Sequence, residues 1–325
     1  MVTPQITSAV LDDWKIWIDD AEKLRASETI PLASFVYSLE KAAESANKSH
    51  LGWLIGNSSN YLSRGVLGRV VMGAKTIGIG LHWLCRYQSL IQDATNVKLE
   101  ITDGVARLSY NILDPDIWPR EQDSLYTLGI FANFLRAASI DVMSHVKVNL
   151  QSPKQQKNSE LQKYFHAPIT YSALVNEITF PAKFLSNPLA RETTFSQNDI
   201  TELTQIFTKK NRCMSFYERT KYAIYAALLE SNISQEFVAK EIGLSPRTLR
   251  RKLLKESISY QDLLDDCRMG IASRELSLSK YISLSQLAFR LGYSEHSTFS
   301  RAFSSWFGVS PRIYRKTITG MNDIN

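Results

Sequence analysis

Hydrophobic residues recur at helical spacing in two similar stretches in the last third of the chain. The first reads ISQEFVAKEIGLSPRTLRRKL and begins at Ile233, and the second reads ISLSQLAFRLGYSEHSTFSRAF and begins at Ile282. Each stretch predicts a short helix, a tight turn and a second helix with an apolar stripe. We therefore expect two helix-turn-helix units, at about residues 233–257 and 283–307.

The turn of each unit has the residues that close packing of two helices requires. An alanine lies where the second helix crosses the first, and four residues later a glycine allows a positive φ. These pairs are Ala239 with Gly243 and Ala288 with Gly292. The dipeptide Ser245-Pro246 then predicts an N-cap followed by proline at the first helical position.

Serines are also expected to cap the helices of the second unit. Ser294 is placed to cap its second helix, and Ser283 with Gln286 fits a capping box for its first helix. The apolar stripes of the two second helices consist of Leu249, Leu253 and Leu254 in the first unit and Phe299, Phe303, Trp306 and Phe307 in the second unit.

The faces opposite these stripes carry arginine, histidine and hydroxyl side chains. The candidate DNA-contacting residues are Arg247, Thr248, Arg250, Arg251, His296, Ser297, Ser300 and Arg301. A guanidinium group matches guanine O6 and N7 or a phosphate, and a helix that bears it fits the major groove. Any one such helix could instead have a solvated basic face. The recurrence of turn, cap, stripe and polar face in both units favours DNA reading.

The segment between the two units, Tyr260 to Leu278, also shows helical periodicity. A helix of that length is about 30 Å long. Because this length is close to one turn of DNA, the helix could hold the two units in successive major grooves on one face of the duplex.

The carboxyl-terminal part of the chain resembles the DNA-binding domain of the AraC/XylS family of bacterial transcription regulators. The segment GYSEHSTFSRAFSSWFGVSPRIYRK, from Gly292 to Lys316, carries the family's glycine, aromatic and serine, its phenylalanine-rich helix, its Gly-Val-x-Pro and its Tyr-Arg. The resemblance implies base-reading roles for the arginines 247, 250 and 251 and for residues 296, 297, 300 and 301. The pair Ser304-Ser305 departs from the family, which usually has a basic residue there.

Charge is distributed unevenly along the chain. Residues 1–211 hold 21 Lys+Arg and 21 Asp+Glu, whereas residues 212–325 hold 17 and 11, so the net charge of +6 lies in the part with the paired units. Such a surface is suited to approach phosphates. The chain has no apolar run near the roughly 20 residues of a membrane span and no leader-like start, so we expect a cytoplasmic protein without membrane contact.

Cysteine and histidine usage predicts neither a metal site nor a cofactor. Cys85, Cys213 and Cys267 are isolated in the sequence and are expected to be free thiols. The five histidines show no HxxxH spacing and form no metal-ligand set.

The first 210 residues predict an α+β domain. A hairpin is expected at Val97 to Asn111, where a two-residue Asp103-Gly104 turn pairs Leu99 with Leu108 on one face and Glu100 with Arg107 on the other. The other expected helices lie around Trp14 to Ile18, around Leu32 to Leu39, at Ser124 to Ala138 and after Ser196. Between the second and third of these we expect a turn or short helix and then a longer helix through Leu81, Leu84, Cys85 and Leu90. Strands are expected at His145 to Leu150, Ile169 to Val175 and Glu177 to Phe180.

This amino-terminal part resembles the effector domain of one branch of the AraC family, the α+β domain called arabinose-binding. The segments that carry the resemblance are GVLGRVVMGAKTIGIGLHWLCRYQSLI and HAPITYSALVNEITFPAKFLSNPL, from His166 to Leu189. The resemblance implies a small-molecule pocket, a dimerisation surface or both. Four donors could bind an anionic ligand such as a carboxylate, namely His82, Arg86, Arg107 and His145, although each is more often a surface or satisfied polar residue.

These observations predict a two-domain regulator with an α+β effector or dimerisation domain at 1–210 and an all-α DNA-binding domain at 211–325. We expect a dimeric, ligand-responsive activator that binds promoter DNA and contacts RNA polymerase. One alternative is an amino-terminal domain that only dimerises. Another is an enzyme fused to a DNA-binding tail, such as a DNA-repair alkyltransferase. That chemistry needs an activated cysteine and a cysteine-rich zinc site, and only Cys85 lies in this domain, so we expect no catalytic residues.

Overall fold

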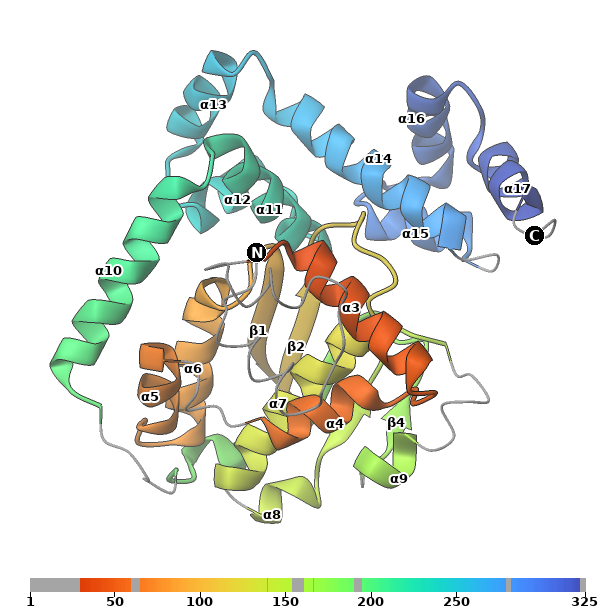
Figure 1. Cartoon of the computed structure of the whole chain (residues 1–325). Helices are drawn as coiled ribbons and strands as arrows, with labels where there is room; N and C mark the ends of the chain where they lie inside the picture. Colours follow the sequence, from red (N-terminus) through yellow and green to blue (C-terminus); the bar gives the residue numbers. More distant parts are fainter. Residues whose placement is uncertain are drawn as a thin grey trace. The chain divides into compact units, whose positions relative to one another are not determined.

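The computed structural model describes residues 30–59, 65–138, 140–153, 161–165, 167–189, 195–278 and 282–321 (Figure 1). These residues divide into two compact units. The first contains the chain up to Ile112 and from Ile117 to Asn211, and the second contains Leu113 to Asp116 and the chain from Arg212 onward. The helix expected around Trp14 to Ile18 lies outside the described residues. Within the described residues, no helix is both long enough and apolar enough to cross a lipid bilayer.

A five-stranded sheet forms the frame of the first unit, with the strand order β1-β2-β5-β3-β4. The pairs are antiparallel except for β3 with β4, which are parallel. The strands are β1 (Thr95–Thr102), β2 (Val105–Ile112), β3 (Lys147–Asn149), β4 (Ile169–Thr170) and β5 (Asn176–Pro181). The strand expected at Ile169 to Val175 is wrong beyond Thr170, because Ser172 has a φ of 56° and its backbone is not extended.

The predicted hairpin is confirmed in its register. Leu99 pairs with Leu108 and Glu100 with Arg107 across the turn at Asp103 and Gly104, both of which have positive φ. Alternation along β2 then places Ala106, Leu108 and Tyr110 in the core. The ionic partner of Arg107 is not Glu100, however, because its guanidinium lies 3.1 Å from the carboxylate of Glu177 on the neighbouring strand β5.

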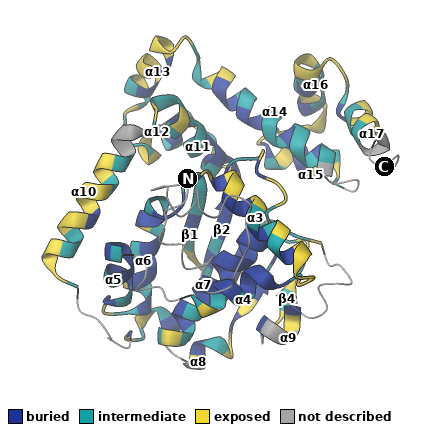
Figure 2. Ribbon diagram, viewed as in Figure 1, coloured by how far each residue is buried: buried dark blue, intermediate teal, exposed yellow. Residues whose placement is uncertain are grey.

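One long buried helix, α7, packs against α3, α4 and α8 and against the sheet. Figure 2 shows how much more of α7 and α4 is buried than of α10. The helices are α3 (Leu32–Ser45), α4 (Leu51–Ser58), α5 (Gly65–Met72), α6 (Ile77–Tyr87), α7 (Glu121–Ala138), α8 (Ile140–Met143), α9 (Leu161–Phe165) and α10 (Gln197–Cys213), with 3₁₀ turns η2 (Gln88–Leu90) and η4 (Ala182–Ser186). The helix expected to run through Leu90 therefore ends at Tyr87 and continues as a 3₁₀ turn.

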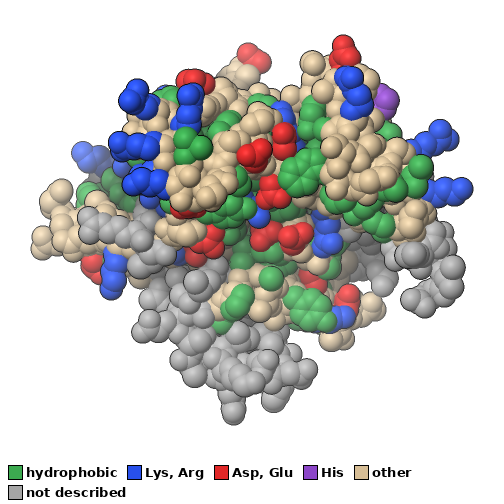
Figure 3. All heavy atoms as spheres, turned by 90° about the horizontal axis from the view of Figure 1, so that it is seen from above, with side chains coloured by type: hydrophobic (Ala, Val, Ile, Leu, Met, Phe, Trp, Pro, Cys, Tyr) green, Lys and Arg blue, Asp and Glu red, His purple; other side chains and the backbone are tan. Residues whose placement is uncertain are grey.

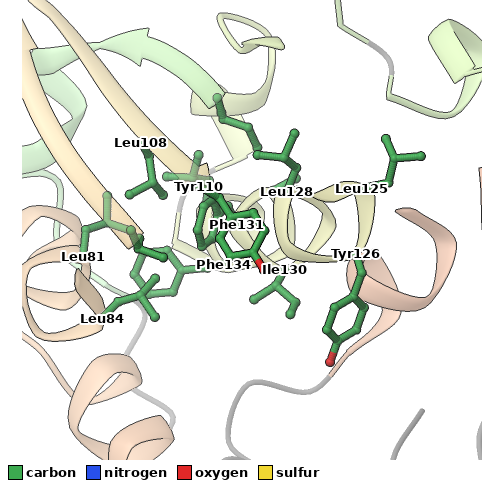
Figure 4. Close-up of a cluster of buried hydrophobic side chains, with 14 of the residues drawn as sticks. Leu81, Leu84, Leu108, Tyr110, Leu125, Tyr126, Leu128, Ile130, Phe131 and Phe134 are labelled. Atoms are coloured by element: carbon green, nitrogen blue, oxygen red, sulfur yellow. The ribbon is translucent and has the colours of Figure 1, made fainter. Parts of the chain in front are cut away.

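The core of the first unit lies between α7, the sheet and α6. Figure 4 shows Phe131 and Phe134 of α7 among Leu108 and Tyr110 of β2 and Leu81 of α6. All five side chains are almost fully buried. A helix with apolar residues around nearly its whole circumference is expected to be covered on all sides, which agrees with the central position of α7.

Glycines allow α4 to lie against the backbone of α7. A Cβ at Gly52 would lie 2.0 Å from the carbonyl oxygen of Gln122, and a Cβ at Gly56 would lie 1.9 Å from that of Tyr126. On the α7 side, a Cβ at Gly129 would meet the backbone of α4 at 2.8 Å. No larger residue fits these positions unless the helices move apart.

The second unit is helical. Its helices are α11 (Phe216–Leu229), α12 (Gln235–Glu241), α13 (Pro246–Lys255), α14 (Tyr260–Leu278), α15 (Leu284–Arg290), α16 (His296–Phe307) and α17 (Pro311–Met321). Two hydrophobic clusters hold it together, one around α11, α12 and α13 and one around α15 and α16. Helix α14 contributes to both, with Leu263, Leu264 and Cys267 in the first cluster and Met269, Ala272 and Leu276 in the second. It therefore joins the two cores, with the bounds that the sequence predicts.

Candidate nucleic-acid interface

The two predicted turns have the same backbone geometry. Gly243 and Gly292 have φ of 72° and 75°, in the left-handed region that favours glycine. In each turn the residue after the glycine donates its N–H to the carbonyl of the alanine five residues earlier, at 2.8 Å from Leu244 and 3.0 Å from Tyr293. This hydrogen bond satisfies a carbonyl at the end of each first helix, so both turns fix the direction in which the second helix starts.

The second helix of the first unit, α13, begins as predicted. The hydroxyl of Ser245 accepts the N–H of Thr248 at 3.2 Å, and Pro246 occupies the first turn. Leu249 and Leu253 are fully buried, whereas Leu254 is 62% exposed. The assignment of Leu254 to the apolar stripe is therefore wrong, because residues one position apart lie about 100° apart around a helix and only the face with the four-residue spacing meets the core.

The second helix of the second unit, α16, is capped differently from the prediction. Its N-cap is Glu295 rather than Ser294, and no side chain caps it. Ser283 does occupy the N-cap position of α15, but its hydroxyl makes no cap hydrogen bond, so the predicted capping box is wrong. Along the stripe of α16, Phe299 and Phe303 are buried and Trp306 is 50% exposed, whereas Phe307 is 36% exposed and its ring lies 4.5 Å from that of Phe303.

The polar faces of α13 and α16 are open to solvent. Arg247, Arg250 and Arg251 are exposed on α13, as are His296, Ser297 and Arg301 on α16, whereas Thr248 and Ser300 are half-buried. Within the described ranges, these four arginines form no ion pair with an acidic residue; Arg301 only approaches the Thr298 hydroxyl, at 3.5 Å. Figure 3 shows Lys and Arg side chains standing out from the surface seen from above. Guanidinium groups held in this way can bind an anionic partner without first breaking a salt bridge.

The two polar faces differ in charge. Helix α13 carries Arg247, Arg250, Arg251, Lys252 and Lys255 within ten residues. Helix α16 carries Arg301 and His296, and the carboxylate of Glu295 next to its first turn accepts the hydroxyl of Ser297 at 2.9 Å. The first helix is therefore suited to strong phosphate attraction, and the second has more neutral hydrogen-bonding groups.

The four donors suggested for an effector site have separate surroundings in the first unit. His82 and Arg86 are exposed on α6, and Arg107 of β2 is paired with Glu177, which also accepts the Asn149 amide at 2.7 Å. The ring of His145 lies 5.2 Å from that of Phe184 and its Nδ1 lies 2.9 Å from the Ser144 hydroxyl. An effector role for these residues stays a prediction.

Sequence reasoning missed two residues of α14 that hold the two helix-turn-helix units together. Arg268 of α14 is only 7% exposed, and its guanidinium binds the turn of the second unit. The Tyr260 hydroxyl donates to the carbonyl of Ile233 at 2.8 Å. The signal that could have identified Arg268 is an arginine in a helix position with apolar neighbours in the same turn, Cys267 and Ile271.

The part of the chain that the structure describes has no group of three or more His, Cys, Asp or Glu side chains that could hold a metal ion. Burial raises the pKa of both the Cys85 and the Cys267 thiols to about 12, so both remain protonated at neutral pH. A protonated thiol is a poor nucleophile.

Family models match both units. Residues 17–189, more than half of the chain, match the arabinose-binding domain of AraC transcription regulators, N-terminal part. Residues 238–317 match a helix-turn-helix domain. The second match covers both predicted turns and the two helices that follow them, α13 and α16.

Curated relatives are also regulators. The ornithine utilization regulator of Pseudomonas aeruginosa is 23% identical over 274 residues, which are 82% of this chain and 78% of the relative. The HTH-type transcriptional regulator VirS of Mycobacterium tuberculosis is 42% identical over 82 residues, 25% of this chain and 24% of that protein. The urease operon transcriptional activator of Escherichia coli is 36% identical over 88 residues, 27% of this chain and 29% of the relative.

Among solved structures, the transcriptional regulator CdpR from Pseudomonas aeruginosa is 19% identical and covers 96% of this chain and 97% of its own, with a TM-score of 0.41. The two family models match most of the amino-terminal domain and most of the paired helix-turn-helix region. The chain therefore belongs to the AraC family of DNA-binding transcription regulators.

Proposed function

We propose that this regulator reads specific promoter sites by placing α13 and α16 in two successive major grooves of one duplex. The observation that carries the proposal is the equivalence of the two units. Both have a glycine turn with the same hydrogen bond, and both turn buried residues inward and an exposed polar face outward. A recognition helix of this kind contacts base edges with its amino-terminal residues.

The contacts that we propose divide by chemistry. Arg247, Arg250 and Arg251 on α13 and Arg301 on α16 are suited to guanine edges and phosphates, because a guanidinium offers two parallel donors. Thr248, Ser297 and Ser300 can donate to or accept from either kind of partner. The ring of His296 presents a donor and an acceptor at the exposed start of α16.

The length of α14 supports the two-groove arrangement. Its 19 residues correspond to about 28 Å at 1.5 Å per residue, which is close to the pitch of about 34 Å that separates successive major grooves. The helix packs into the cores of both units, so it can serve as a rigid spacer between them.

Selection from a random duplex library tests this function. The purified full-length chain should enrich sequences with two separate conserved blocks about one helical turn apart, and its affinity should fall steeply with added salt. Enrichment of a single block would contradict the two-groove arrangement. Failure to enrich any duplex over random DNA would contradict sequence-specific reading altogether.

For the amino-terminal unit we propose an effector-binding role, together with homodimerisation that brings two regulators to one promoter beside RNA polymerase. The family model that matches it is described as an arabinose-binding domain, which supports a small-molecule role without identifying the ligand. A ligand that binds only the folded protein raises its unfolding temperature. A metabolite panel that never shifts this temperature, with a dimer seen by light scattering, would favour the alternative of a domain that only dimerises.

A further inference from the structure

The two helix-turn-helix units meet each other at Gly292. A Cβ on this residue would lie 2.7 Å from the Cδ1 atom of Ile233, and 3.5 Å from both its Cγ1 atom and the Nη2 atom of Arg268. Ile233 directly precedes Ser234, the N-cap of α12. The start of the first unit therefore packs against the turn of the second.

The corresponding glycine of the first unit has no such neighbour. Gly243 has almost the same φ, 72° against 75°, but a Cβ there would meet nothing within 4 Å. The turn geometry explains both glycines equally well. The close approach of Ile233 is the additional constraint at Gly292 alone.

Arg268 fixes the same turn to α14. Its Nε donates to the carbonyl of Leu291 at 2.9 Å, and its Nη1 lies 3.0 Å from the carboxylate of Asp265. The guanidinium also lies 4.5 Å from the ring centroid of Tyr293. A buried cation is costly unless it is paired and hydrogen-bonded, so these partners define one position of the turn on the helix.

Tyr260, the first residue of α14, holds Ile233 at the start of that helix. Its hydroxyl donates to the Ile233 carbonyl at 2.8 Å, and it precedes Arg268 by eight residues, about 12 Å along the helix. Tyr260, Ile233, Gly292 and Arg268 thus close a ring of contacts in which each unit is attached to α14 and to the other unit. We call these four residues the junction.

We propose that the junction determines which spacing of the two half-sites the protein accepts, an inference that rests on the proposed two-groove function. Adding one base pair between half-sites moves the second site by about 3.4 Å and rotates it by about 35°. If the second unit were attached only through apolar side chains, it could tilt to follow the displaced half-site. The junction opposes that movement, because its hydrogen bonds and the Ile233–Gly292 contact hold at only one relative position.

Binding to a set of duplexes tests the proposal. The half-sites selected by the wild-type chain are placed at their selected separation and at one and two base pairs more or less, and each dissociation constant is measured. Ile233→Val removes the Cδ1 atom above Gly292, and Arg268→Met removes the guanidinium and its hydrogen bonds but keeps an unbranched apolar stem. We expect both variants to bind the selected spacing but to lose about fivefold or more of the preference over the shifted spacings, the lower end of typical coupling energies.

The two glycines provide the matched comparison. Alanine in the left-handed region strains both turns equally, so Gly243→Ala should weaken binding at every spacing without changing the preference. Gly292→Ala should change the preference, and combining it with Ile233→Val should reduce that change. Thermal unfolding and circular dichroism verify that each variant is folded.

The binding experiments distinguish failure of the junction's role from failure of the proposed two-groove function. If folded Ile233→Val and Arg268→Met both discriminate among spacings as sharply as the wild type, this inference is wrong and the two-groove function stands. If the wild-type chain selects no paired half-sites, the proposed function fails and the inference fails with it.

Discussion

The hydroxyl of Tyr110 on β2 donates a 2.5 Å hydrogen bond to the carboxylate of Asp123 on α7, and both side chains are completely buried. The amide of Gln92 donates to both of them, at 3.0 and 3.2 Å. This polar cluster lies inside the core of the amino-terminal unit. Burial raises the pKa of the Asp123 carboxyl to about 6 in spite of these hydrogen bonds.

The pKa of a second carboxyl is also raised, that of Glu40 on α3, which lies against the start of α7. Burial raises the pKa of Glu40 to about 7, and the neighbouring acidic residues Glu121 and Asp123 raise it further. Its Oε1 accepts the backbone N–H of Gln122 at 2.7 Å, which acts in the opposite sense. Both carboxyls are therefore more easily protonated in the folded than in the unfolded chain.

The amino-terminal unit should lose stability as the pH rises through these values. A carboxyl whose pKa is raised in the folded state contributes fully to the free energy of unfolding below its pKa in the unfolded chain, near 4. This contribution is lost as the pH rises through the folded pKa values of about 6 to 7. Glu40→Gln keeps the acceptor for Gln122 and removes the titration. Urea unfolding at pH 5 and pH 8 gives the free energy of unfolding of the variant and of the wild type. Relative to the wild type, the variant should be about 1–3 kcal/mol more favourable at pH 8 than at pH 5. If the stability difference between variant and wild type is the same at both pH values, the raised pKa of Glu40 is contradicted.

Gly56→Ala should strongly destabilise the amino-terminal unit. The new Cβ would lie 1.9 Å from the Tyr126 carbonyl oxygen, so α4 must move away from α7, and we expect a loss of about 3 kcal/mol or more in free energy of unfolding. The control is Gly270→Ala in α14, where the nearest atom is an ordinary 3.7 Å away. That change should stabilise by up to about 1 kcal/mol, because alanine favours helix. Equal effects at the two sites would contradict the close packing of α4 on α7.

The Cys85 and Cys267 thiols should react slowly in the native protein. Burial raises both pKa values to about 12, and the thiolate is the reactive form. Alkylation at pH 8 followed by peptide mass spectrometry should leave both thiols unmodified in the folded chain and modify both in denaturant. Rapid native modification of Cys85 would revive the possibility of an activated thiol in the amino-terminal unit.

Removing single guanidinium groups from the recognition helices should weaken specific binding. Arg251→Ala on α13 and Arg301→Ala on α16 should each cost about 1–3 kcal/mol against the selected site. Lys48→Ala is the control, because it also removes one positive charge, from an exposed position that follows α3 in the other unit. Gel-shift titrations in which all three variants bind like the wild type would contradict the assigned contacts.

The sequence predicts the paired helix-turn-helix units well because their signals are local. The glycine turns, the Ser245 cap and the bounds of α14 all depend on residues close together in the chain, and the structure confirms them. The hairpin register is confirmed for the same reason, since a two-residue turn fixes it.

Tertiary contacts explain what the sequence could not predict. Whether Leu254 or Trp306 is buried depends on how far each helix rotates on its neighbours. Arg107 pairs with Glu177, which lies 70 residues away in the sequence, and not with Glu100 across the hairpin. The junction around Arg268 joins residues from 233 to 292, so no short pattern marks it. The close approach of α4 to α7 likewise depends on glycines whose partners are remote in the sequence.

Methylation interference at guanine N7 tests the two-groove account most directly, because N7 lies in the major groove. On a selected duplex, the account predicts interference in two blocks about one helical turn apart on the same face of the DNA. Arg251→Ala should lose interference in one block and Arg301→Ala in the other. Interference in a single block, or two blocks that neither substitution changes, would contradict the account.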